Sequence, residues 1–112
     1  MMAPGYKFTE KALQDVADER GRQVNEEGYQ RSHDDAHKDG ALALAAAAYI
    51  GHSIKDLGQY GPPDGQDDDV AVLISMAPWS IRAKAPRDSL VKAAALLVAE
   101  IERRDRLRGR AS

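Results

Sequence analysis

The sequence contains no cysteine, which excludes disulfide bonds and zinc sites built on thiolates. Its longest apolar run, residues 41–50, is too short to span a bilayer. Residues 1–9 lack the apolar stretch of a secretory signal peptide. Neither a glycine-rich phosphate loop nor a nucleophile elbow is present. We therefore expect a cytoplasmic protein that makes no membrane contact and carries no familiar catalytic motif.

Charge is nearly balanced overall but unevenly distributed. The formal net charge of −2 argues against general binding to nucleic acid. Acidic residues are in excess over residues 10–40, and basic residues are in excess over residues 87–112. The two regions could face each other in a dimer, serve a metal and a phosphate respectively, or simply form solvated helix faces.

Apolar residues at helical spacing predict two long helices in the first half of the chain. The first should begin near Thr9 and end at residues 26–27, where Gly28 is a natural stop. The second should begin within residues 32–35, which offer good N-cap side chains, and run to about Leu57. Its middle is apolar nearly all round, so we expect it to be the central helix.

The second half of the chain adds a short element and a third long helix. Glycine, proline and aspartate dominate residues 58–69, which we expect to be a flexible loop. Residues 70–76 are compatible with a strand or a short helix, and we favour a helix because no second strand is available to pair with it. The last helix should begin within residues 86–88 and lead into a basic tail at 107–112. One of its faces is an apolar stripe of Leu90, Ala94, Leu97 and Ile101.

These expectations define an all-α fold. Residues 1–112 should form a single domain, a small helical bundle of three long helices plus a short fourth element. The alanine-rich second helix and the broad last helix offer more apolar surface than the thin first helix can cover. We therefore expect a homo-oligomer.

A polar block over residues 26–40 holds the densest group of candidate ligands. His33 and His37 have a spacing that suits a metal when both lie on a helix. Asp34 and Asp35 suit Mg²⁺, which prefers hard oxygen ligands. Helix capping and surface ion pairs are equally adequate roles for these side chains.

A second cluster consists of one aromatic residue and three cations, Trp79, Arg82, Lys84 and Arg87. An aromatic platform beside cations suits a nucleobase and a phosphate. A lone tryptophan also serves often as a core anchor in a small bundle. Tyr29 is a further candidate for stacking on a base.

Several segments together resemble a family of small proteins encoded by phages and prophages. They are Glu19-Arg-Gly-Arg-Gln, Glu27-Gly-Tyr, the stretch from His33 to Gly40, Pro78-Trp79, and the run from Leu90 to Asp105. The resemblance covers most of the chain outside residues 58–76. It implies a viral accessory protein that acts in a bacterial cytosol, and it implies no particular activity.

The carboxylate-bearing helices also resemble, faintly, those of the MazG-like nucleotide pyrophosphohydrolases. That family holds Mg²⁺ with a Glu-Glu-x-x-Glu helix and a Glu-x-x-Asp helix. Glu102 and Asp105 match the second pattern. The first pattern is incomplete, because Gly28 follows Glu26-Glu27 and no third glutamate comes at the required spacing.

The leading hypothesis is that this protein binds, and thereby sequesters, a phosphate-bearing nucleotide or nucleotide signal. The expected ligand-binding residues are Tyr29, His33, Asp35, His37, Trp79, Arg82, Lys84 and Arg87. A second hypothesis is inhibition of a host defence protein through protein–protein contact. A third is a Mg²⁺-dependent pyrophosphohydrolase with the metal on Asp34, Asp35, Glu102 and Asp105.

Overall fold

The computed structural model describes residues 7–26, 40–55, 69–82 and 84–111. Over these ranges the regular structure is entirely helical, which confirms the all-α class. The helices are α1 (Lys7–Glu26), α3 (Ala41–Ile54), α4 (Asp69–Ser75) and α5 (Pro86–Ala111). Residues 70–75 therefore belong to a helix, as predicted, and α5 begins where its proline and acidic first turn indicated.

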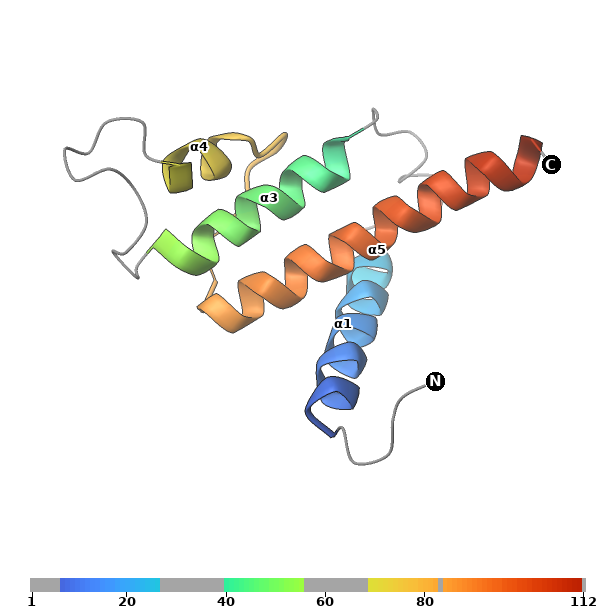
Figure 1. Ribbon diagram of the computed structural model, residues 1–112, viewed down its shortest axis with the longest axis horizontal. Coiled ribbons are helices and arrows are strands. Elements are labelled where there is room, and N and C mark those ends of the chain that lie inside the picture. The colour runs from blue at the N-terminus through green and yellow to red at the C-terminus, as the bar shows by residue number, and fades with distance from the viewer. Residues whose placement is uncertain (1–6, 27–39, 56–68, 83, 112) are drawn as a thin grey trace.

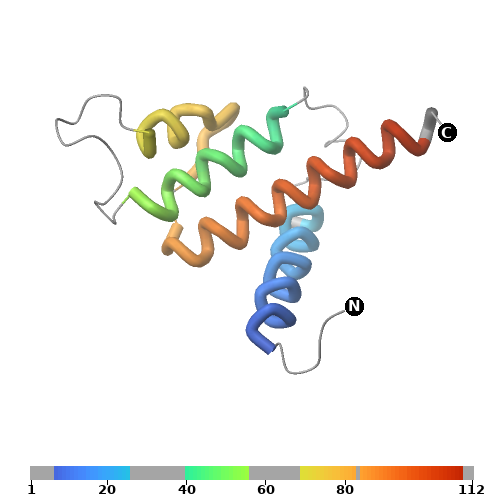
Figure 2. The backbone as a smooth tube through the Cα atoms, viewed as in Figure 1, coloured from blue at the N-terminus to red at the C-terminus, as the bar shows by residue number. Residues whose placement is uncertain are grey.

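α3 and α5 lie side by side and run in opposite directions, and α4 covers α3 on the side away from α5 (Figure 1). α3 is thus the central helix of this layer, as expected. α1 packs on α5 and crosses it steeply, with its N-terminal end directed away from the other helices (Figure 2). The segment after α4 passes behind α3 to reach the start of α5 (Figure 2).

The core lies between α3 and α5 and is built mostly from alanine. Its fully buried members are Leu42, Ala45, Ala46, Ala93, Leu96 and Ala99. Short side chains allow two helix axes to approach closely, because the interaxial distance depends on the residues at the contact. Tyr49, Ile50 and Trp79 pack against the edge of this cluster.

A glycine sets the start of α3. Gly40 has a φ of 91°, in the left-handed region that glycine adopts without steric cost, and its carbonyl accepts the Leu44 amide at 2.8 Å. The expectation of one helix continuing from residues 32–35 is therefore wrong at this point, because a left-handed residue interrupts a right-handed helix. Residues 32–39 themselves, and the expected loop up to residue 68, lie outside the described ranges.

A second glycine permits the close contact between α3 and α4. A Cβ atom on Gly51 would lie 2.9 Å from Cγ1 of Ile74 and 3.2 Å from its backbone nitrogen. Only hydrogen fits there without a shift of α4. The α3–α4 contact, like the core, therefore depends on a small residue of the central helix.

Candidate functional site

A hollow of about 570 Å³ lies where α1, α3 and α5 meet the segment that precedes α5. We call it the Trp79 pocket. Its volume falls in the range of small-molecule sites, roughly 300–1,000 Å³. It is lined by Glu19 and Arg22 of α1, Tyr49 of α3, residues 79–82 and Lys84 of the segment, and Asp88, Val91 and Lys92 of α5.

Trp79 lies where the core and the pocket meet. It is partly buried and packs against the α3–α5 core, as an anchor would. It also lines the pocket, together with Tyr49. One wall of the pocket is therefore aromatic and packs against the core.

Two cations line the pocket without forming an ion pair among the described residues. Arg82 and Lys84 are exposed and line the hollow. Neither forms an ion pair with a carboxylate in the described part of the chain. An anion that enters the pocket therefore meets two positive charges whose donors are available to it.

Two further cations of the pocket are engaged by Glu19. Its Oε2 accepts from Arg22 at 2.6 Å and from Nζ of Lys92 at 3.0 Å. The side chains of Glu19 and Lys92 are only 12% and 13% exposed, so this pair is largely shielded from water. Burial by itself would raise the pKa of Glu19, but the hydrogen bonds from Arg22 and Lys92 prevail and lower it to about 2.

The same acid anchors a buried glutamine. Gln23 is 1% exposed and donates its amide to Glu19 at 3.1 Å, while its Oε1 has no hydrogen-bond partner within the described part of the chain. A buried, unpaired carbonyl oxygen costs about 1–3 kcal/mol. Beside the ion pairs of Glu19, α1 therefore carries one buried polar atom that has no partner among the described residues.

Arg87, the fourth member of the predicted cluster, lies beside the pocket and not in it. It lines a neighbouring hollow of about 310 Å³ with Asp15 and Asp18, and it donates to Asp15 at 2.8 Å. The two hollows share Glu19, Arg22, Asp88 and Val91. The structure therefore brings Trp79, Arg82 and Lys84 together, and it places Arg87 next to them.

The other predicted ligand-binding residues, Tyr29, His33, Asp35 and His37, lie outside the described ranges, as does Asp34 of the predicted metal set. Glu102, from that same set, accepts from Nε of Arg20 at 2.9 Å, and Asp105 is exposed on α5. Across residues 7–26, 40–55, 69–82 and 84–111, no three histidines or carboxylates are grouped as a metal site.

The sequence prediction missed Tyr49, Glu19, Arg22 and Lys92. Lys92 could have been predicted from the sequence, because it is the only charged residue in the otherwise apolar run from Leu90 to Ala99. A lone charge on an apolar helix face requires a partner. Glu19 and Arg22 lie far from Trp79 along the chain, and no local pattern indicates that they meet it.

No family model, curated protein or solved structure matches this chain. None of the described helices is both long enough and apolar enough to cross a bilayer.

Proposed function

We propose that the protein binds a phosphate-bearing nucleotide in the Trp79 pocket. The observation that carries the proposal is the lining of that hollow, where an aromatic wall of Trp79 and Tyr49 meets the cations Arg82 and Lys84. A nucleotide combines a flat aromatic base with a compact anion, which are the two chemistries that such a lining complements.

Each part of the ligand has a proposed partner. The base stacks on Trp79 or Tyr49, which is worth about 1–3 kcal/mol per base in other proteins. The phosphate accepts hydrogen bonds from Arg82 and Lys84, and such charge-assisted bonds contribute about 1.5–3 kcal/mol each. Arg22 and Lys92 also line the wall. Because Glu19 pairs with both of them, they do not add two further uncompensated positive charges.

The single tryptophan makes binding directly measurable. In one experiment, the indole emission of Trp79 is recorded while individual linear and cyclic nucleotides are added. In a second, the protein is incubated with a mixed pool of nucleotides with and without Mg²⁺ and filtered, and the retained and free fractions are analysed by mass. A retained, intact nucleotide that also changes the Trp79 emission supports sequestration. A pool that is neither retained nor altered contradicts the proposal.

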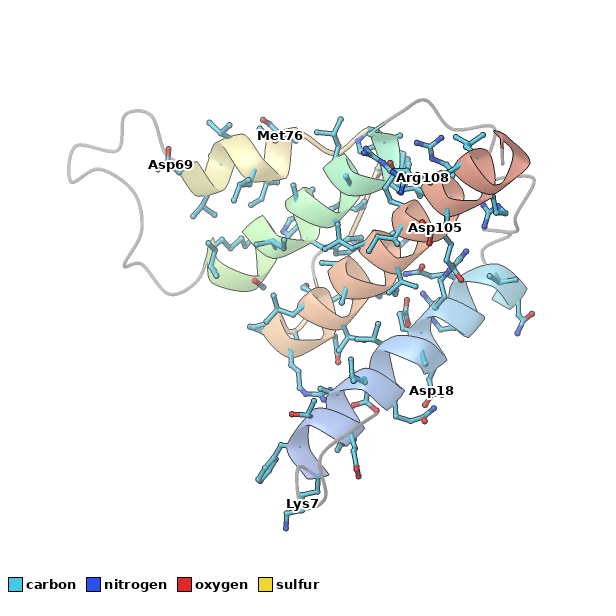
Figure 3. All side chains as sticks on the ribbon, turned by 45° about the vertical axis from the view of Figure 1, so that its right-hand side comes forward. Lys7, Asp18, Asp69, Met76, Asp105 and Arg108 are labelled. Atoms are coloured by element: carbon cyan, nitrogen blue, oxygen red, sulfur yellow. The ribbon has the colours of Figure 1, made fainter. Side chains whose placement is uncertain are left out.

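A charge-matched pair of double variants locates the site. Arg82→Ala with Lys84→Ala should weaken binding about 100-fold or more, because two charge-assisted hydrogen bonds are lost. Lys7→Ala with Lys55→Ala removes the same charge from exposed residues outside the pocket, Lys7 at the far end of α1 (Figure 3), and should leave binding nearly unchanged. Equal losses in the two double variants would mean that only the overall charge matters.

The experiment with the nucleotide pool also distinguishes the two alternative functions, a pyrophosphohydrolase and an inhibitor of a host protein. Pyrophosphate release that depends on Mg²⁺ would favour the pyrophosphohydrolase hypothesis, with Glu102 and Asp105 as its described carboxylates. An unchanged pool would leave an inhibitor of a host protein. The exposed apolar side chains of Val72 in α4 and of Met76 directly after it favour that function, because they offer a contact surface. For a phage-type accessory protein in a bacterial cytosol, sequestration of a nucleotide signal needs no catalysis, and the pocket supports it best.

A further inference from the structure

α5 carries two parallel seams of side chains that are offset by one residue. The inner seam consists of Ser89, Ala93, Leu96, Glu100 and Arg103, which are buried, as are Ala95 and Ala99 of the same helix. The outer seam consists of Leu90, Ala94, Leu97 and Ile101, in which the large side chains are 49%, 41% and 58% exposed in chain order. Both seams alternate steps of four and three residues, so each follows one side of the helix as the seam of a coiled coil does.

The seam that the chain buries is the more polar of the two. Glu100 and Arg103 of the inner seam pair with each other at 2.9 Å inside the fold. The outer seam holds only leucine, alanine and isoleucine, and Val98 beside it is also exposed. The outer seam leaves three large apolar side chains partly in water, and covering them would be favourable because burial of apolar surface stabilises an association. A partner that covers the outer seam would bury these side chains.

We infer that the outer seam pairs with the outer seam of a second copy of the chain, with the two α5 helices antiparallel. The pattern is self-complementary about its midpoint. In this register Leu90 faces Ile101 of the second copy, and Ala94 faces its Leu97. In a two-fold interface, if residue i of one copy contacts residue j of the other, then residue j of the first copy contacts residue i of the second. The seam has this reciprocity, which contact with an unrelated protein would not require.

The charges that flank the seam follow the same symmetry. Arg87 and Asp105 are about five helical turns apart, so they lie on one flank of α5, at opposite ends of the apolar seam. In the antiparallel register Arg87 of each copy meets Asp105 of the other. Asp105 is exposed on the C-terminal half of α5 (Figure 3), and Arg87 uses one of its five donors on Asp15.

The molar mass in solution tests the pairing. Light scattering coupled to size exclusion should give twice the mass of one chain for the wild type and the mass of one chain for Ile101→Glu. Val72→Glu places the same charge at an apolar residue of α4 of similar exposure, and it should remain dimeric. Unchanged helicity by circular dichroism shows that Ile101→Glu is folded. A wild type that stays at the mass of one chain up to millimolar concentration would overturn the inference.

Site-directed crosslinking tests the orientation, since the chain has no cysteine to interfere. A mixture of the Leu90→Cys and Ile101→Cys proteins should form a crosslinked heterodimer with a short thiol–thiol reagent. Leu90→Cys alone should not crosslink, because its two thiols would be about 16 Å apart along the helix axis. Efficient crosslinking of Leu90→Cys to itself would indicate parallel helices and reject the proposed register. A dimer in which neither pair reacts would place the interface elsewhere.

Discussion

α5 makes two contacts of opposite character. Against α3 it presents alanine and leucine that are almost fully buried, and the charged residues of its buried seam, Glu100 and Arg103, pair with each other within α5. Against α1 it presents Lys92 and Glu102, which pair with Glu19 at 3.0 Å and Arg20 at 2.9 Å. Apolar packing does not depend on the charge state of side chains, whereas ion pairs depend on pH, and a pair with an exposed member, such as Glu102, is screened by salt and contributes little. The α3–α5 layer is therefore the stable unit, and α1 is attached to it more weakly.

This difference matters for the pocket, because its walls come from both contacts. Tyr49 and Trp79 are fixed by the α3–α5 core, while Glu19 and Arg22 arrive on α1. Conditions that loosen α1 should alter the charged wall first and leave the aromatic wall in place. The following predictions test that separation, from the largest effect to the smallest.

Leu96→Ala should have the largest effect on stability. Leu96 is 1% exposed at the α3–α5 contact, so its truncation leaves a cavity and should lower the free energy of unfolding by about 2–5 kcal/mol. Leu44→Ala removes the same atoms from a partly exposed residue of α3 and should cost much less. Urea unfolding followed by circular dichroism measures both. Similar losses would show that the α3–α5 core is not the main source of stability.

Lys92→Met should loosen α1 and leave the core intact. Glu19 would keep Arg22 but lose a partner in a shielded position, which should cost about 1–3 kcal/mol. The double variant that also carries Glu19→Gln removes the shielded carboxylate that has lost one of its two partners, and it should recover part of the loss. Amide hydrogen exchange should accelerate in α1 before α3. Equal acceleration of exchange in α1 and α3 would contradict the conclusion that α1 is attached to α5 more weakly than α3 is.

Two glycine variants should shift stability in opposite directions. Gly51→Ala places a Cβ against Ile74 and should destabilise the α3–α4 contact by about 1–3 kcal/mol. Gly21→Ala meets no atom within 4 Å and should stabilise α1 by roughly 0.5–1 kcal/mol, because alanine favours helix. Melting temperatures would show the two signs. A stabilising Gly51→Ala would refute the close approach of α4.

The last prediction is a dependence of α1 docking on acid. The pKa of Glu19 is lowered from 4.5 to about 2 in the folded chain, so its ionised form stabilises the fold above pH 4.5. That contribution should fall as the pH drops from 4.5 towards 2, and Glu19→Gln should lack it. Unfolding measured across this range in both proteins tests the assignment. Parallel pH profiles for wild type and Glu19→Gln would exclude Glu19 as the titrating group.

Local features of the chain were predictable, and the residues show why. The bounds of α1 and α5 follow from caps and helical periodicity, which act over a few residues. Trp79, Arg82 and Lys84 were expected to act together, and they do share a hollow, because a short segment keeps neighbours in sequence close in space. The start of α3 was predicted too early because the left-handed conformation of Gly40 outweighed the apolar pattern around it.

The sequence by itself determined the helical class, most helix boundaries and one wall of the pocket, since each depends on interactions between residues close together in the chain. The tertiary structure decided which seam of α5 is buried and which residues complete the pocket. Two seams one residue apart have the same periodicity, so spacing cannot choose between them. The packing of α1 and α3 on α5 decides which seam is buried. The same packing brings Glu19 to Lys92, which is 73 positions away in the sequence.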